Sequence, residues 1–227
     1  MVASIRATFD RQLDLLQKDV LRLAEMVDGE LEQAVTAVQN HDLGLAWRVD
    51  TYDASVNQTR YAIEEQAYIL LALQQPNSRD MRTIVAVVSI VTNLERMGDH
   101  AAAMARQILV MGEEQQHPEI DLPEITQMAA MAQKNLHDAM AAFVAGDHIR
   151  AHDIAHRDKD VDALYSQVFH KLIALMAGNP PIVEHATRLL SIAHDVERFS
   201  DRVGNICERI SYMATGELHR TRLDEMP

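Results

Sequence analysis

The apolar residues of this chain recur in steps of three and four, and the whole pattern occurs twice. With an offset of 102 positions, eight apolar residues between 87 and 111, spaced by three and four, fall on apolar residues between 189 and 213. With an offset of 105, the expected cap Asp42 falls on Asp147, and Ala46, Val49 and Val56 fall on Ala151, Ile154 and Val161. Steps of three and four place apolar side chains on one face of an α-helix, and repetition of the pattern indicates a duplicated unit. The sequence therefore predicts an all-α fold of two tandem three-helix bundles.

Turn signals divide each unit into three long helices. Glycine (8) and proline (6) are scarce, so the places where they cluster are informative. Asp42 is expected to cap the second helix, the Pro76-Asn77-Ser78 turn to precede the third, and the GNPP turn at 178–181 to precede the last. The expected helices cover residues 4–40, 42–75, 78–113, 122–145, 147–177 and a last stretch that ends at 215. The linker near 113–124 gives two expected domains, residues 1–113 and 114–227.

The charge of the chain restricts its partners. The net charge is −13, and no cluster of Lys and Arg offsets it, so neither nucleic acid nor an anionic membrane surface is an expected partner. We find no signal peptide and no apolar run long enough to span a bilayer, which indicates a cytoplasmic protein without membrane insertion. The single cysteine, Cys207, excludes an internal disulfide framework.

Two pairs of acids occupy matching places in the two repeats. Glu95 and Asp99 stand one helical turn apart in "LERMGDHA", and Glu197 and Asp201 do the same in "VERFSDRV". Such pairs repel each other on a helix, whereas a bound cation makes the same spacing favourable. The preceding helices carry further acids and amides near these positions. The candidate metal ligands are Glu95, Asp99, Asp53, Asp158, Asp162, Glu197 and Asp201, with Asn57 and Asn205 as additional oxygen ligands. One oxygen-rich metal site in each repeat is the resulting hypothesis.

A metal-free interpretation stays open at this point. Acids make up enough of the chain that several pairs at this spacing are expected by chance on solvated helix faces. Arg96 and Arg198 follow the first acid of each pair, so either arginine can neutralise its neighbours without any metal. His156 and His194 fall near the acidic positions and are candidate extra ligands.

No catalytic constellation is found. The chain lacks a glycine-rich phosphate loop and a G-x-S-x-G motif, and its one Glu-x-x-His spacing, Glu114 to His117, falls in the linker beside a proline. A ferritin-like di-iron oxidase needs that motif on core helices. We therefore expect a protein that is not an enzyme; a metal-dependent redox or hydrolytic enzyme is the less favoured alternative.

Four segments resemble motifs of the PhoU family: "QQPNSRDMR", "LERMGDHAAAMA", "RDKDVDALY" and "VERFSDRVGNICERISYMATGE". The resemblance covers nearly the whole chain and implies two three-helix bundles, often as a homodimer. It implies metal binding through the ExxxD and DxxxD motifs, with iron or zinc favoured and magnesium or manganese as alternatives. It also implies a negative regulator of phosphate uptake and of the phosphate regulon, which binds the ABC phosphate transporter and the sensor histidine kinase.

This chain departs from the family pattern in its first repeat. Asn57 stands where the helix-two motif has its second acid, and Ala103 stands where the second repeat has Asn205. The first-repeat site is therefore expected to have fewer charged ligands and to bind metal more weakly. A metal-free helical adaptor that serves another transporter or signalling pathway is the alternative function.

Overall fold

The computed structural model describes residues 2–74, 76–112 and 120–217, and in these residues it is helical throughout, without strands. The elements of the first half are α1 (Val2–Asn40), α2 (Leu43–Gln74) and α3 (Ser78–Met111). Those of the second half are α4 (Pro123–Ala145), α5 (His148–Ala155), α6 (Asp158–Gly178), the short 3-10 helix η1 (Pro180–Ile182) and α7 (Val183–Thr215). The expected all-α fold is confirmed.

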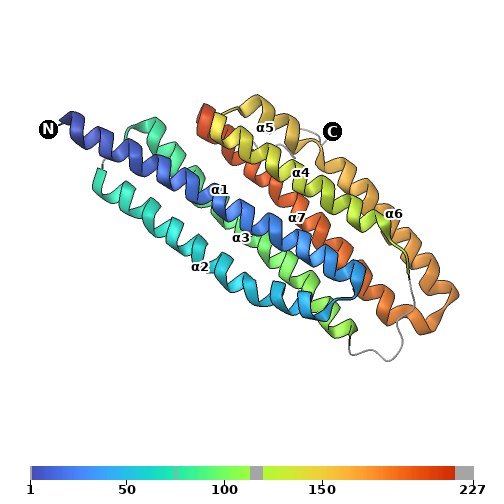
Figure 1. Ribbon diagram of the computed structural model, residues 1–227. Helices are drawn as coiled ribbons and strands as arrows, with labels where there is room; N and C mark the ends of the chain where they lie inside the picture. The colour runs from blue at the N-terminus through green and yellow to red at the C-terminus, as the bar shows by residue number, and fades with distance from the viewer. Residues whose placement is uncertain (1, 75, 113–119, 218–227) are drawn as a thin grey trace.

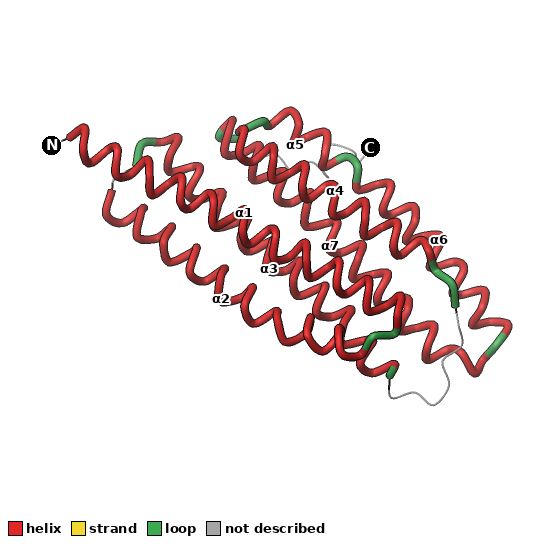
Figure 2. Tube along the Cα trace, viewed as in Figure 1, coloured by secondary structure: helices red, strands yellow, loops and turns green. Residues whose placement is uncertain are grey.

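The helices form two bundles side by side, with their long axes running in nearly the same direction (Figure 1). Helices α1, α2 and α3 pack on one another, as do α4, α7 and the α5–α6 pair. The bundles meet chiefly where α3 packs on α7, and also where α1 packs on α4, so α2 and α6 lie on the two outer edges. Where the structure describes the connections between helices, they are short (Figure 2). The expected boundary between residues 113 and 114 and the first part of the linker expected near 113–124 fall within residues 113–119, outside the described residues, and α4 begins at Pro123, inside the expected linker.

The repeated apolar pattern forms the core. On α3 and α7 the matched apolar positions are all buried, and they are Val87, Ile90, Leu94, Met97, Ala101, Met104, Ile108, Met111, Leu189, Ile192, Val196, Phe199, Val203, Ile206, Ile210 and Met213. Each large apolar side chain buried in this way contributes about 1.5–3 kcal/mol to folding. One face of each central helix is therefore committed to the core, and the positions flanking that face carry the acids.

The helix starts agree with the capping signals of the sequence. The Asp42 carboxylate accepts a hydrogen bond from the Leu45 backbone N–H at 2.9 Å, and Asn77 Oδ1 accepts from those of Arg79 and Asp80 at 2.9 and 3.0 Å. Asp147 caps α5 in the same way. These caps fix where α2, α3 and α5 begin, and with them the register of the acids that follow.

The helix expected over 147–177 is wrong in one respect, because the chain breaks it between α5 and α6. Arg157 turns its guanidinium to Asp138 on α4, with 2.6 Å between Nη1 and Oδ2, and Arg150 donates to the same carboxylate at 2.7 Å. The Arg157 and Asp160 N–H groups bond three residues back, to Ile154 and Arg157, as in a tight turn. As a result Asp158 begins α6 instead of lying inside a continuous helix, and an acid in the first turn is favourable to the helix dipole.

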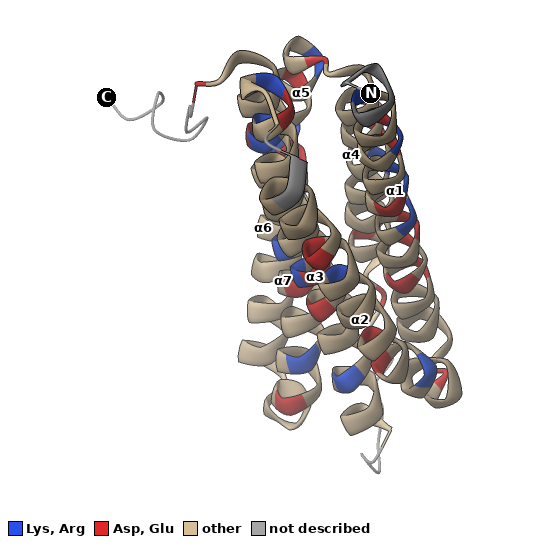
Figure 3. Ribbon diagram, turned by 90° about the vertical axis from the view of Figure 1, so that its left-hand side faces the viewer, with Lys and Arg blue, Asp and Glu red and all other residues tan. Residues whose placement is uncertain are grey.

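Acidic and basic residues are interspersed along the helices that Figure 3 presents. None of the described helices has the length and apolar character that crossing a bilayer requires.

Candidate metal centre

The first-repeat cluster draws acids from three helices. Asp53 comes from α2 and Glu95 and Asp99 come from α3, as the sequence predicts. A fourth acid, Glu30 on α1, joins them and was not among the candidates from sequence. The bare backbone of Gly98 on α3 lies between Glu30 and Asp53: a β-carbon there would stand 2.8 Å from Glu30 Oε2 and 3.6 Å from Asp53 Oδ1.

Glu30 is the most deeply enclosed acid of the described residues, with 1% of its surface exposed. Neither of its carboxylate oxygens has a hydrogen-bond partner among the described residues. Burial, together with the nearby charges of Asp53 and Asp99, raises the pKa of Glu30 to about 9. An acid in this position lacks a counter-charge, and a cation would supply one.

Asp53 is half-buried and is held by its own helix. Asn57 Nδ2 donates to Asp53 Oδ2 at 3.0 Å, whereas Asp53 Oδ1 is enclosed without a hydrogen-bond partner. Burial and the charge of Asp99 raise the pKa of Asp53. Asn57 therefore orients Asp53 with its amide nitrogen, and its own amide oxygen is the atom suited to a cation.

Glu95 lies near a cation that the sequence did not suggest. Arg60 on α2 approaches it, with 3.9 Å between Nε and Oε1, although Arg60 pairs more closely with Glu64, at 2.8 Å. Arg96, the neighbour expected to neutralise the pair, is exposed. Burial first, and the charge of Asp99 second, raise the pKa of Glu95. The contact with Arg60 thus leaves Glu95 with an unfavourable negative charge.

The second-repeat cluster brings the start of α6 against α7. Ser200 Oγ donates to Asp158 Oδ1 at 2.9 Å. Burial, with the charges of Asp201 and Asp162, raises the pKa of Asp158 to about 6 even though the Ser200 hydrogen bond acts the other way. Burial and the charge of Asp201 raise the pKa of Glu197 to about 7. The predicted acids of this repeat are therefore close enough to influence one another's protonation.

The other predicted members of this cluster differ in exposure. Asp201 is buried, and Arg198 Nη1 donates to its Oδ2 at 2.8 Å, as the metal-free interpretation expects. Asp162 is exposed at the rim, and Asn205 is half-buried one turn beyond Asp201. Arg198 thus supplies this cluster with a built-in cation at Asp201.

The two candidate histidines have different surroundings. His194 Nδ1 lies 3.5 Å from Glu197 Oε2, and its ring centroid is 5.8 Å from that of Tyr165. His156 instead directs Nδ1 to the backbone oxygen of His152, at 2.8 Å. Of the two, only His194 contacts a candidate ligand.

The donor sets suit a hard or borderline cation, because they are carboxylates with amide oxygens and one nearby imidazole. Enclosed oxygens without hydrogen bonds occur in both clusters: two on Glu30, one on Asp53 and one on Glu197. In their present positions, no three His, Cys, Asp or Glu side chains of the described residues are close enough together to hold one ion. The suitability of these residues for a cation is therefore inferred from the chemistry of their donor atoms and from the enclosed oxygens that accept no hydrogen bond.

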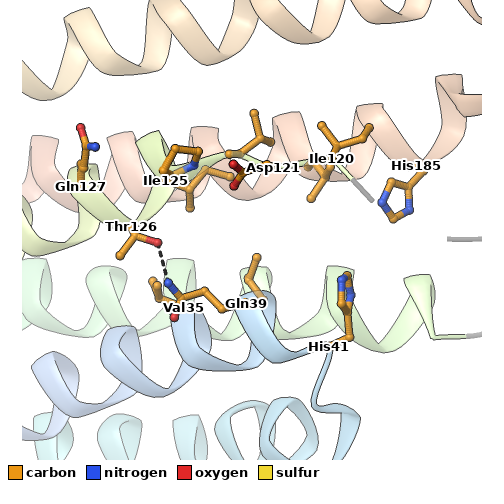
Figure 4. A pocket seen from close by; sticks show the side chains of 13 residues that line it. Val35, Gln39, His41, Ile120, Asp121, Ile125, Thr126, Gln127 and His185 are labelled. Atoms are coloured by element: carbon orange, nitrogen blue, oxygen red, sulfur yellow. Dashed lines mark hydrogen bonds between the residues drawn. The ribbon is translucent and has the colours of Figure 1, made fainter. Parts of the chain in front are cut away.

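A separate hollow of about 550 Å³ lies where the two repeats meet (Figure 4). It is bordered by the end of α1, the start of α4 and His185 of α7, and Gln39 Nε2 donates to Thr126 Oγ1 across it at 2.8 Å. It shares no residue with either acidic cluster. The clusters are thus not part of this pocket.

Comparison with known proteins gives consistent matches over nearly the whole chain. The family of the PhoU domain matches residues 20–108 and again residues 125–210. A phosphate-specific transport system accessory protein PhoU homolog of Streptococcus pneumoniae is 35% identical over 214 residues, which cover 94% of this chain and 98% of the relative. A homolog of the same name from Clostridium acetobutylicum is 31% identical, over 93% of this chain and 96% of the relative.

Solved structures agree with the fold. The crystal structure of the phosphate transport system regulatory protein PhoU from Streptococcus pneumoniae superposes with a TM-score of 0.85 at 33% identity, covering 93% of this chain and 99% of that one. PhoU from Pseudomonas aeruginosa gives a TM-score of 0.86 at 29% identity, over 92% of this chain and 100% of that one.

Proposed function

The chain belongs to the PhoU family, and from this membership we propose that it is an accessory protein that regulates phosphate transport and has no enzymatic activity of its own. The observation that carries the proposal is the extent of the match. This chain covers 98% of a relative that is named as an accessory protein of the phosphate-specific transport system. Coverage of this extent supports a role shared with that relative.

In its finer form the proposal follows the family resemblance of the sequence motifs. The protein lowers phosphate uptake and represses phosphate-regulon signalling when phosphate is plentiful. It does so in the cytoplasm, as a homodimer, by binding components of the ABC phosphate transporter and the sensor histidine kinase. Its acidic character, with a net charge of −13, favours basic surfaces on those partners.

Metal binding is the second part of the proposal. A cation, iron or zinc in preference to magnesium or manganese, is held by Asp53, Glu95 and Asp99 in the first repeat. In the second repeat the ligands are Asp158, Asp162, Glu197 and Asp201. Asn57 and Asn205 supply neutral oxygens. The raised pKa values of Glu197 and Asp158 support this role, because a bound cation would stabilise the charged forms that burial disfavours.

A metal-free adaptor is the second candidate, and one observation favours it. Arg198 already supplies a positive charge to Asp201 at 2.8 Å. Elemental analysis of protein purified without a metal-affinity column separates the two candidates. Stoichiometric bound metal supports the metal-binding candidate. The metal-free adaptor is supported if the purified protein contains no metal and takes up none when metal is added.

The regulatory role is tested in the source organism, or in a relative that lacks its own homolog and is complemented with this gene. Alkaline phosphatase activity is measured in excess phosphate, with and without the gene. We expect high activity only without it. Equal activity in both strains would mean that this chain has the family fold but regulates something else.

A further inference from the structure

The two repeats fill equivalent space around their acidic clusters in different ways. An offset of 105 places Glu30 of α1 on Asn135 of α4, and an offset of 102 places Gly98 of α3 on Ser200 of α7. Glu30 and Asn135 are both buried. The first repeat therefore combines a long acid with a glycine, where the second combines a short amide with a serine.

Glu30 fits beside α3 because residue 98 is a glycine and has no side chain. A β-carbon on Gly98 would stand 2.8 Å from Glu30 Oε2, closer than a carbon and an oxygen tolerate. In the second repeat, the side chain of Ser200 is present and donates its hydroxyl to Asp158 at 2.9 Å. Glu30 thus reaches the cluster in the first repeat through a space that Ser200 occupies in the second.

The presence of Glu30 also gives the first repeat the same number of carboxylates as the second. The first repeat lacks an acid at Asn57, where the second has Asp162. With Glu30 included, each repeat has four carboxylates: Glu30, Asp53, Glu95 and Asp99 in the first, and Asp158, Asp162, Glu197 and Asp201 in the second. The first cluster therefore has as many carboxylates as the second, although the motif residues alone indicate fewer.

We propose that Glu30 is a cation ligand, and that the first repeat forms a three-helix metal site in which the carboxylate of α1 takes the part of the acid missing at Asn57. This inference rests on the proposed metal binding and extends it to a residue outside the ExxxD and DxxxD motifs. Neither carboxylate oxygen of Glu30 has a hydrogen-bond partner among the described residues, and Oε2 lies on the side of Gly98 where Asp53 Oδ1, also without a hydrogen bond, approaches; a small cation is a partner of suitable size and charge for these oxygens.

The donors also define the class of cation. The four acids offer oxygen only, and the nearby His100 on α3 directs its Nδ1 to Asp195 of α7, at 3.1 Å. Oxygen-only sites favour hard ions, so for the first repeat this inference replaces the general preference for iron or zinc with one for Mn²⁺, Mg²⁺ or Fe³⁺. The second cluster has His194 beside Glu197 and is better suited to zinc or ferrous iron.

The test uses the full chain, stripped with a chelator and titrated with Mn²⁺ by calorimetry, with bound metal counted by elemental analysis after dialysis. The variant E197Q/D201N removes two ligands of the second repeat, so that the first site is observed alone. In that background we expect E30Q to lower the Mn²⁺ affinity at least about tenfold, because even the loss of an outer-shell partner of a ligand costs about 10–100-fold. The matched control is E32Q, which removes an exposed acid from the same helix two residues on and should leave the affinity unchanged.

The outcomes separate this inference from the one on which it rests. If E30Q and E32Q bind Mn²⁺ equally well, Glu30 is no ligand, although metal binding by the protein stands. If the stripped wild type takes up no Mn²⁺, Mg²⁺, Zn²⁺ or iron, the proposed metal binding fails and this inference with it. If E30Q does not fold, E30D keeps the charge on a shorter side chain, and in the E197Q/D201N background an Mn²⁺ affinity of E30D equal to that of the parent variant would overturn the assignment.

Discussion

Gly98 on α3 and Glu30 on α1 have complementary shapes: a β-carbon on the glycine would lie 2.8 Å from Oε2 of the acid. The nearest other contacts of that position would be Val56 Cγ1 at 3.2 Å and Asp53 Oδ1 at 3.6 Å, so the surroundings leave little room for adjustment. The pair is therefore expected to be coupled energetically.

A double-mutant cycle measures this coupling. G98S alone should lower the free energy of unfolding by about 1–3 kcal/mol, because overpacking outweighs the better helix propensity of serine. E30N combined with G98S reproduces the residues of the second repeat, Asn135 and Ser200, and should recover about 0.5–3 kcal/mol of that loss. Urea denaturation of the four proteins, with a chelator present, gives the coupling energy. Additive effects would mean that the serine fits beside Glu30 without conflict.

Glu30 should also make stability depend on pH. Its pKa is about 9 in the folded chain and about 4.5 when exposed. Between these values the folded state keeps a proton that the unfolded chain releases, so the stability that this group contributes is present at low pH and is lost as pH rises. The slope for one proton is at most about 1.4 kcal/mol per pH unit.

The E30Q variant isolates this effect, because glutamine resembles the protonated acid and does not titrate. Asp158 and Glu197, with pKa values of about 6 and 7, act in the same direction at lower pH in both proteins. The free energy of unfolding of metal-stripped E30Q should therefore exceed that of wild type by a growing margin between pH 7 and 9. Parallel curves in urea denaturation over that range would show that Glu30 does not titrate there.

The sequence predicts the fold well because its signal is long and repeated. The matched apolar positions of α3 and α7 could be identified without the structure, since burial of one helix face requires that spacing. The break before Asp158 could not, because it depends on Arg157 and Arg150 meeting Asp138 on another helix. Local propensity does not report a tertiary ion pair of this kind.

The site was predictable only in part, for a similar reason. Glu95, Asp99, Glu197 and Asp201 share a motif within one helix, so their spacing reveals them. Glu30 has no acid one turn away on α1, and its position beside the cluster becomes evident only when Gly98 of α3 is brought opposite it. One signal was available: the 105 offset, extended to the first helix, aligns Glu30 with Asn135, two polar residues inside an apolar pattern.

Arg198 distinguishes the metal-bound and metal-free interpretations. It donates to the buried Asp201 at 2.8 Å, so R198M should cost metal-stripped protein about 1 kcal/mol of stability by removing that charged hydrogen bond. If a cation binds the same acids, the arginine competes with it, and R198M should bind Zn²⁺ more tightly than wild type. Thermal melts with and without Zn²⁺ report both effects. A purely structural ion pair predicts the loss of stability with no gain in Zn²⁺ response.

The acids of the second repeat should matter in the cell if metal binding serves regulation. The E197Q/D201N variant removes two candidate ligands from α7, and it should fail to restore low alkaline phosphatase activity in a deletion strain grown in excess phosphate. The control D160N/E184Q removes the same number of charges from exposed positions of α6 and α7 and should restore it as wild type does. Circular dichroism and immunoblotting establish that both variants are folded and present in equal amounts. Full repression by E197Q/D201N would separate the regulatory role from the second-repeat cluster, and the partner-binding surface would then have to be sought on other faces of the two bundles.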